Sequence, residues 1–201
     1  MSKSYFILSE EKEPQLFHLM RDYSLSVGIC FFIADINGDR QSVITGSHCL
    51  CEKIKSTAKE KAACENCQMH QMIRPIKNGS INKYLCHAGF THVPLPVYIN
   101  NILVGYIIIG RLAEIQNRSL LEKNQTSMLS DQLNTETYFS AERLEKVVDL
   151  FVNLAQSTLT TSNPKRKINV GQLRDANEMI ETFPKKTEII NAVKYIEKNL
   201  H

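Results

Sequence analysis

The stretch from Thr91 to Gly110, THVPLPVYINNILVGYIIIG, decides the fold of this chain. Its two halves, Thr91 to Ile99 and Ile102 to Gly110, are rich in β-branched and aromatic residues, and Asn100-Asn101 separates them. This pattern is typical of two strands joined by a tight turn. Because Ile107-Ile108-Ile109 has no polar face, we expect the second strand to lie at the centre of a sheet, buried on both sides.

Three further strands are predicted upstream. Val27 to Asp35 is another β-branched and aromatic run, the turn signal Asn37-Gly38 follows it, and Gln41 to Thr45 returns as its hairpin partner. Ile81 to Cys86 has the same character. The sequence therefore predicts a sheet of about five strands.

Helices are predicted on either side of these strands. Ser9 to Ser24 carries apolar residues at helical spacing, and Ser9 with the glutamates after it is typical of a helix start. The stretch from Ser47 to Asn78 is rich in Lys, Glu, Ala, Met and Gln and predicts two helices. The polar residues 114 to 139 predict a loop with one helical turn.

A longer helix is predicted from Ser140 to about Thr160. Ser140 is a suitable N-cap, and an apolar seam follows at Leu144, Val147, Phe151 and Leu154. The seam is shorter than the roughly three to four heptads that establish a coiled coil. Packing on the chain's own sheet and pairing with a second copy therefore both remain open.

This order of helices and strands is typical of PAS- or GAF-like sensor domains. It predicts an α+β fold, in which an antiparallel sheet of about five strands carries helices on one side. A long C-terminal helix for signalling or dimerisation follows. We expect a ligand pocket between the sheet and its helices. We assign residues 1–160 to this domain and residues 161–186 to a linker with one short helix.

Composition excludes several classes of protein. The 201 residues are 43% hydrophobic and 22% charged, which indicates a globular domain. A net charge of +3 is too small to indicate a nucleic-acid or membrane surface. No apolar run approaches the ~18 residues of a membrane span, and the N-terminus does not resemble a secretory signal. We expect a cytoplasmic protein whose six cysteines are reduced or bind metal.

A set of motifs resembles a known family. The motifs are Cys51-Glu52-Lys53-Ile54, Cys64, Tyr84 to Phe90 (YLCHAGF), Leu95-Pro96-Val97 and Gly105 to Gly110 (GYIIIG). With them, residues 10 to 155 resemble the PocR sensory domain, a ligand-binding module of bacterial AraC-type transcription regulators and histidine kinases. The resemblance implies a sensor of small diol or polyol metabolites, since propanediol is associated with the family's namesake. It implies no catalysis, and the chain also lacks an H-E-x-x-H motif or a phosphate-cradling glycine loop.

His87 is the first candidate for ligand contact, because one of its ring nitrogens can donate a hydrogen bond while the other accepts one. The alternative is an imidazole bound to backbone at a strand end, where Gly89 supplies the positive φ of a turn. We expect further contacts from a thiol and from aromatic rings, although such rings are commonly plain core. These candidates are Cys86, Phe32, Tyr84, Phe90 and Tyr106. Arg111 follows the predicted strand, and we expect it to be exposed rather than to reach a ligand carboxylate.

The cysteines offer a different chemistry. Cys64 and Cys67 form a C-x-x-C pair, and with Cys51 and Cys86 they make four soft ligands, enough for zinc or an iron–sulfur cluster in a metal or redox sensor. The spacing is irregular for a zinc knuckle, and buried thiols commonly pack as small hydrophobic groups. Within the family resemblance, Gln68 stands where an acidic residue is typical and Cys67 is an additional thiol. We expect Cys30 to be core.

The resemblance also implies partners. Family members usually act as dimers, so we expect the helix after Ser140 to join two copies and to relay the ligand signal. Residues 187–201 look like the first helix of an AraC-type DNA-binding domain, too short for two helix-turn-helix units. DNA contact is therefore expected only through a C-terminal domain that is truncated here. We interpret Lys165-Arg166-Lys167 as a solvated linker rather than a DNA contact.

Overall fold

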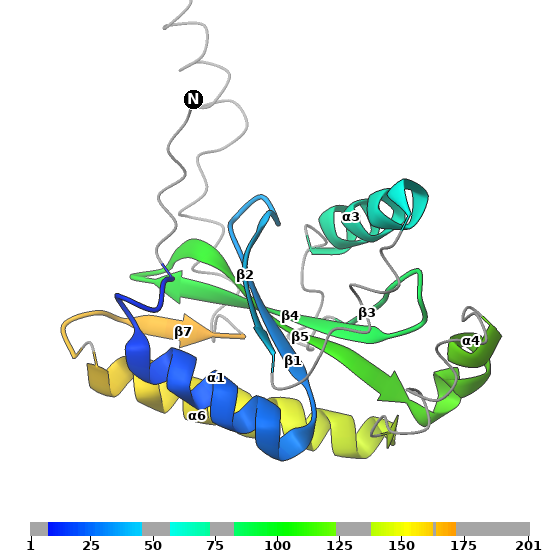
Figure 1. Cartoon of the computed structure of the whole chain (residues 1–201). Helices are drawn as coiled ribbons and strands as arrows, with labels where there is room; N and C mark the ends of the chain where they lie inside the picture. Colours follow the sequence, from blue (N-terminus) through cyan, green and yellow to red (C-terminus); the bar gives the residue numbers. More distant parts are fainter. Residues whose placement is uncertain (1–7, 46–56, 73–82, 124–137, 163, 172–201) are drawn as a thin grey trace, which may run out of the picture.

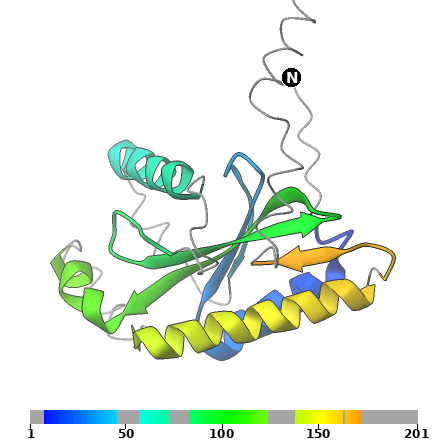
Figure 2. The same cartoon turned by 180° about the vertical axis from the view of Figure 1, so that it is seen from behind.

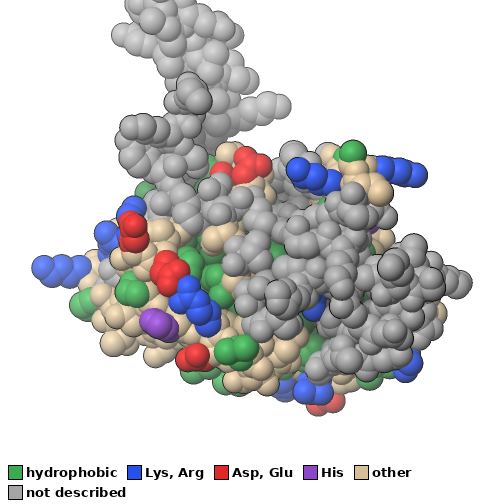
Figure 3. Space-filling model, in the orientation of Figure 1, with side chains coloured by type: hydrophobic (Ala, Val, Ile, Leu, Met, Phe, Trp, Pro, Cys, Tyr) green, Lys and Arg blue, Asp and Glu red, His purple; other side chains and the backbone are tan. Residues whose placement is uncertain are grey.

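The computed structural model describes residues 8–45, 57–72, 83–123, 138–162 and 164–171. In this part of the chain a twisted sheet lies between two helices on one face and a third helix on the other (Figures 1 and 2). The α+β fold class is confirmed. Among the described helices, none combines the length and the apolar character needed to cross a membrane. Basic and acidic side chains are interspersed over the described surface that Figure 3 shows.

Five strands form the sheet in the order β2-β1-β5-β4-β3, with antiparallel neighbours throughout. They are β1 (Cys30–Ala34), β2 (Arg40–Thr45), β3 (Tyr84–Leu85), β4 (Thr91–Ile99) and β5 (Ile102–Glu114). The central position predicted for Ile107-Ile108-Ile109 is confirmed, because β5 lies between β1 and β4 and these three side chains are at most 1% exposed. Two short strands join this sheet: β7 (Ile168–Val170) pairs with β4, and β6 (Tyr138–Phe139) runs parallel to the end of β5.

Both predicted hairpin turns are confirmed. Asn100 and Asn101 have φ of 51° and 65°, the left-handed pair that a two-residue turn between twisted strands requires. In the other hairpin Gly38 has φ of 88°. There the Asp35 carboxylate accepts hydrogen bonds from the backbone N–H groups of Asn37 and Asp39, each at 2.9 Å, and so closes the turn.

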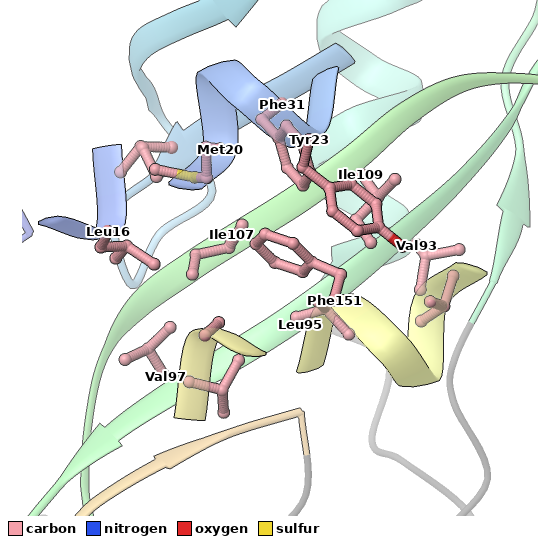
Figure 4. Packing of buried hydrophobic residues seen from close by; sticks show 14 of the residues in the cluster. Leu16, Met20, Tyr23, Phe31, Val93, Leu95, Val97, Ile107, Ile109 and Phe151 are labelled. Carbon is pink, nitrogen blue, oxygen red and sulfur yellow. The ribbon is translucent and has the colours of Figure 1, made fainter. Parts of the chain in front are cut away.

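The main core lies between the sheet and two helices, α1 (Pro14–Val27) and α6 (Ala141–Ser162). Its centre is an aromatic group (Figure 4): the Phe151 ring lies 4.5 Å from Phe31 and 5.5 Å from Tyr23, centroid to centroid. The Tyr23 hydroxyl donates a hydrogen bond to the carbonyl of Val147, 2.7 Å away. Tyr23 therefore buries its ring and still satisfies its polar atom, which ties α1 to α6.

Helix α1 differs from its predicted bounds. Ser9 does not cap it. The Ser9 carbonyl instead accepts the N–H groups of Lys12 and Glu13 in a preceding turn. The helix begins at Pro14, where a missing N–H costs no helical hydrogen bond, and runs to Val27 before Gly28 ends it with φ of 75°. The next strand therefore starts at Cys30, three residues later than predicted.

Helix α6 begins after the predicted cap, since the Ser140 hydroxyl accepts the N–H of Arg143 at 3.2 Å. The predicted apolar seam was partly wrong. Leu144 and Phe151 are buried, but Leu154 is 38% exposed and Val147 is half-buried. The buried face consists of Leu144, Val148, Phe151, Ala155 and Leu159. The helix lies on a broad sheet, so its core positions follow the 3.6-residue helical repeat instead of the narrower coiled-coil repeat.

After α6 the chain turns back and adds β7 to the outer edge of β4. The Gln156 side chain on α6 holds this strand: its amide nitrogen donates to the Ile168 carbonyl, and its oxygen accepts the Val170 N–H at 2.9 Å. The Gly171 N–H donates to the Pro96 carbonyl at 2.9 Å. Part of the stretch that we predicted as linker, residues 161–186, thus forms a strand of the sheet. Residues 172–201, including the predicted DNA-binding start, lie outside the described residues.

The region predicted as a loop is more ordered at both ends. Strand β5 continues to Glu114, and a 3-10 turn (Ile115–Asn117), helix α4 (Arg118–Lys123) and, further on, β6 follow. The expected helical turn is α4, whereas residues 124–137 lie outside the described residues. Of the two helices predicted between Ser47 and Asn78, the structure describes α3 (Ala58–Met72). Residues 46–56 and 73–82 are outside the described residues.

Replacing Phe151 by alanine should lower the free energy of unfolding by about 3–5 kcal/mol, because the ring is fully buried against two other aromatic rings. The control is Leu25→Ala, which removes a side chain on α1 that is 68% exposed and should change stability by less than about 0.5 kcal/mol. Urea unfolding followed by circular dichroism measures both. Equal losses in the two variants would contradict the assigned core face.

Candidate functional site

A second apolar cluster lies on the face of the sheet that α1 and α6 do not cover. Alternate residues of a strand point to opposite faces, so Phe31 and Ile33 enter the main core while Phe32 points the other way. The buried members of this second-face cluster are Cys30, Phe32, Ala34, Tyr84 and Ile108, and Cys67, Cys86 and Tyr106 pack against them. Four predicted ligand residues, Phe32, Tyr84, Cys86 and Tyr106, are therefore brought together from three strands and the turn after β3.

His92 belongs beside this cluster, and sequence reasoning missed it. Its ring stacks on Tyr84 with centroids 5.2 Å apart and an interplanar angle of 12°, and it lies 6.0 Å from the Phe32 ring. The signal was present in the sequence: Val93, Leu95 and Val97 alternate into the main core, so His92, Pro94 and Pro96 must face the other way.

Gly110 allows these rings to approach the sheet. A Cβ at this position would lie 2.3 Å from Cε2 of Phe32 and 2.8 Å from Nδ1 of His92, distances at which atoms overlap. Only glycine fits this site without a shift of one ring, because any other residue carries a Cβ.

Arg111 was predicted to be an exposed residue after the strand, and this prediction is wrong. It lies inside β5, is 5% exposed and has φ of 56°. The cause is a β-bulge: Thr91 pairs with Leu112 but Val93 pairs with Ile109, so Gly110 and Arg111 together oppose His92. A left-handed arginine is strained, and this strain lies directly beside the aromatic stack.

His87 lies in the tight turn that connects β3 to β4. The Cys86 N–H donates to the Phe90 carbonyl at 2.8 Å, and the Gly89 N–H donates to the Cys86 carbonyl at 2.9 Å. Gly89 has φ of 94°, as expected for a turn glycine. The imidazole is half-buried. Ligand contact by His87 stays a prediction.

Phe90 was predicted to line the same pocket, but the structure places it elsewhere. It is fully buried in a separate cluster with Ala88, Ala113 and Leu121, against which Cys86 and Tyr138 pack. Cys86 contacts this turn cluster and the second-face cluster alike. The turn that holds His87 therefore lies between two apolar clusters.

Helix α3 approaches the same turn through Cys67. Its thiol lies 3.7 Å from the Leu85 carbonyl, to which it donates a weak hydrogen bond. Burial raises the pKa of the Cys67 thiol, and nearby Cys64 adds to this rise, whereas the His87 backbone N–H opposes it by hydrogen bonding to the sulfur. At neutral pH Cys67 is therefore a neutral thiol and a poor nucleophile.

The metal-binding alternative finds no support in the part of the chain that the structure describes. There, no group of three or more His, Cys, Asp or Glu side chains is arranged to hold an ion. Cys64 and Cys67 are half-buried thiols on α3, and Cys30 is core, 2% exposed, as predicted. Cys51, the fourth predicted ligand, lies outside the described residues, so a zinc or iron–sulfur site that uses it stays a prediction.

The phenols of Tyr106 and Tyr98 share one electrostatic property, a raised pKa. Burial raises the pKa of the Tyr106 phenol, and for Tyr98 burial is again the larger cause, with Tyr106 the smaller. Both phenols therefore keep their protons and can donate hydrogen bonds. Together with the thiols and aromatic rings, they make a largely apolar surface with hydroxyl and thiol donors, and the buried Arg111 of the bulge lies beside it. Such a surface suits a small molecule with hydroxyl groups.

Gly110→Ala should destabilise the fold by about 1–3 kcal/mol, because the new methyl group overpacks Phe32 and His92. Phe32→Leu removes the nearer of the two rings. The double variant should therefore lose less stability than the sum of the losses in the two single variants, and the difference should be about 1 kcal/mol. Urea unfolding of the four proteins in this cycle provides the measurement, and strictly additive losses would show that Gly110 and Phe32 do not meet.

Alkylation of Cys67 by iodoacetamide should require a higher pH in the folded chain than in urea, because burial raises its pKa. A raised pKa also means that the folded state prefers the protonated thiol. The stability that this group contributes is then complete below its unfolded pKa and is lost as the pH rises through the folded value. Peptide mass spectrometry measures the rate of Cys67 alkylation at each pH in the folded chain and in the urea-unfolded control. The difference between the two pH–rate profiles gives the pKa shift. Superimposable profiles would exclude it.

Comparison with known proteins agrees with this arrangement. The profile of a family described as the sensory domain found in PocR matches residues 12–163. The regulatory protein PocR of Salmonella typhimurium is 22% identical over 94 residues, which cover 47% of this chain and 31% of that protein's length. No solved structure gives a significant match. Because the family match spans most of the sequence, this chain belongs to the family of PocR sensory domains.

Proposed function

We propose that this chain is the ligand-sensing input domain of a cytoplasmic bacterial transcription regulator and that it binds a small diol or polyol at the second-face cluster. Its family is a sensory one rather than a family of enzymes, and its Salmonella relative is a regulatory protein. The observation that carries the ligand class is the set of aromatic, hydroxyl and thiol groups on this face, namely Phe32, Tyr84, Cys86 and Tyr106 with His92 stacked beside them.

In this proposal the aromatic rings cover the carbon chain of the ligand while its hydroxyl groups meet polar atoms. The imidazole of His87 offers one donor and one acceptor. The Tyr106 hydroxyl, which stays protonated because burial raises its pKa, offers a donor. A diol has two hydroxyl groups that need partners when they leave water, and in this proposal His87 and Tyr106 supply them.

The proposed output runs through α6 to a second copy and to a DNA-binding domain. Leu150 and Leu154 are 54% and 38% exposed on α6, one turn apart and away from the core, which supports a homodimer contact on this helix. Regulation requires the ligand to bind one arrangement of the dimer more tightly than the other, because a ligand with equal affinity for both would shift nothing.

A thermal-shift titration tests the ligand class. With 1,2-propanediol, ethanediol or glycerol at about one hundred times its Kd, a bound ligand stabilises the native state by ~2.7 kcal/mol. Tm should then rise by roughly 5–10 °C and keep rising with the logarithm of the ligand concentration above Kd. Sucrose is the control, because an excluded osmolyte stabilises all proteins roughly in proportion to its concentration. If none of the three gives a logarithmic rise in Tm that exceeds the sucrose control, the ligand class is wrong.

His87→Ala should weaken binding of the active diol at least about tenfold, because a hydroxyl group loses a buried partner. Its own Tm without ligand should stay within a few degrees of the wild-type value. His18→Ala, which changes an exposed histidine on α1, is the matched control and should bind normally. Unchanged affinity of His87→Ala in isothermal titration calorimetry would exclude the assigned contact.

A further inference from the structure

A buried carboxylate lies at the point where the hairpin of the candidate site meets the start of α6. Glu114 is the last residue of β5 and is 2% exposed. One of its oxygens accepts a hydrogen bond from the Thr91 hydroxyl at 2.5 Å. The other oxygen accepts a hydrogen bond from the side-chain amide of Gln116 at 2.9 Å and forms an ion pair with the Lys83 ammonium at 3.4 Å. A carboxylate this deeply buried is stable only with such partners.

Two of these partners belong to the hairpin that carries His87. Lys83 directly precedes β3, and Thr91 is the first residue of β4. Thr91 and Leu85 pair across the hairpin, and the turn from Cys86 to Gly89 lies between them. The Glu114 carboxylate therefore contacts both sides of this hairpin, Thr91 next to the turn with one oxygen and Lys83 just before β3 with the other.

The backbone of the same residue holds the segment that leads into α6. Glu114 pairs with Phe139 in β6, and Ser140, the α6 cap, follows at once. The Arg143 guanidinium, in the first turn of α6, lies 5.2 Å above the Phe139 ring. A second contact runs alongside: Tyr138 of β6 packs on the turn cluster that contains Phe90. Two sets of contacts thus connect the hairpin to the N-terminal end of α6, one through Glu114 and one through the small apolar cluster around Phe90.

We propose that Glu114 is a positioning residue that couples the His87 hairpin to the first turn of α6. A ligand that draws the hairpin toward the second-face cluster changes the length of the Thr91 and Lys83 contacts. Glu114 transmits this change to β6 and the α6 cap. The ligand part of this inference rests on the proposed function, but the coupling is a property of the chain without ligand and can be measured there.

Glu114→Gln is the decisive variant. The amide has the size of the carboxylate but only one acceptor oxygen, so it cannot hold Thr91 and Lys83 on separate oxygens. Residue-resolved amide hydrogen exchange, followed by NMR on the full chain, is the readout. The Cys86 and Gly89 amides in the turn and the Leu144 amide, which donates to the Ser140 carbonyl in the first turn of α6, should all exchange about tenfold faster. The Gly28 amide at the end of α1 should be unchanged.

Matched variants separate coupling from general destabilisation. Glu142→Gln makes the same chemical change at an exposed site in the first turn of α6 and should leave the turn amides unchanged. Thr91→Val alters only the hairpin side and should still accelerate the exchange of the Leu144 amide. Thr161→Val, at an exposed site on α6 where the hydroxyl donates only to the Ser157 carbonyl, should not. If Glu114→Gln does not fold, the Thr91→Val comparison decides in the same way.

The outcomes are distinct. The coupling would be overturned by any of three results in Glu114→Gln. The turn amides could exchange faster while the Leu144 amide does not, all amides including that of Gly28 could exchange faster to the same degree, or no exchange rate could change. Addition of 1,2-propanediol then tests the proposed function separately. If the hairpin variants accelerate Leu144 exchange but none of the three diols and polyols raises the Tm of wild type above the sucrose control, the ligand class fails and the coupling stands. If such a rise in Tm occurs but Leu144 exchange is insensitive to both hairpin variants, the sensor stands and Glu114 is not its link to α6.

Discussion

Strand β5 must satisfy its backbone on both edges and bury side chains on both faces, and the rest of the described structure depends on this constraint. Its partners are β1 and β4. Ile107 and Ile109 enter the main core under α1 and α6, while Ile108 belongs to the second-face cluster. Because unpaired backbone groups are costly inside a protein, the strand cannot leave this position without loss of both apolar clusters. The helices are arranged around a strand that is already fixed.

The same strand also contains the irregular feature that shapes the candidate site. The bulge at Gly110 and Arg111 interrupts regular pairing opposite His92. Without a Cβ at Gly110, the Phe32 and His92 rings can lie against the sheet, and the extra residue places Arg111 in a left-handed conformation. Bulges next to functional sites commonly redirect side chains. Here strain and close aromatic packing occur within two consecutive residues of an otherwise regular strand, which supports a role beyond stability for this face.

Helix α6 is held at both ends by parts of the sheet. Near its N-terminus, β6 pairs with the end of β5, and towards its C-terminus Gln156 holds β7 against β4. A helix attached in this way moves with the sheet rather than as a free lever. In the proposed dimer, the outer side of α6, with Leu150 and Leu154 exposed, is the side that would carry a displacement of the sheet to the second copy.

Sequence patterns were sufficient wherever one local signal decided the outcome. Both hairpin turns follow from the left-handed preference of Asn and Gly, and the central strand follows from three consecutive isoleucines. Bounds were less certain where two signals competed, as at the start of α1, where Ser9 looked like a cap but Pro14 begins the helix. For α6, the coiled-coil repeat and the 3.6-residue repeat both fit the apolar residues, and only the broad sheet beneath the helix selected the second.

Composition and local pattern by themselves determined the fold class, the central position of the strand that contains Ile107 to Ile109, and the family to which the motifs point. Tertiary structure alone decided which residues meet. His92 stacks on Tyr84, Cys67 approaches the His87 turn, Phe90 belongs to a different cluster, and Glu114 joins a hairpin to a helix. The physical reason is that turns and strand faces depend on neighbours in the chain, whereas these contacts join residues far apart in sequence. A single-residue bulge in β5 sets their register, and no local pattern encodes it.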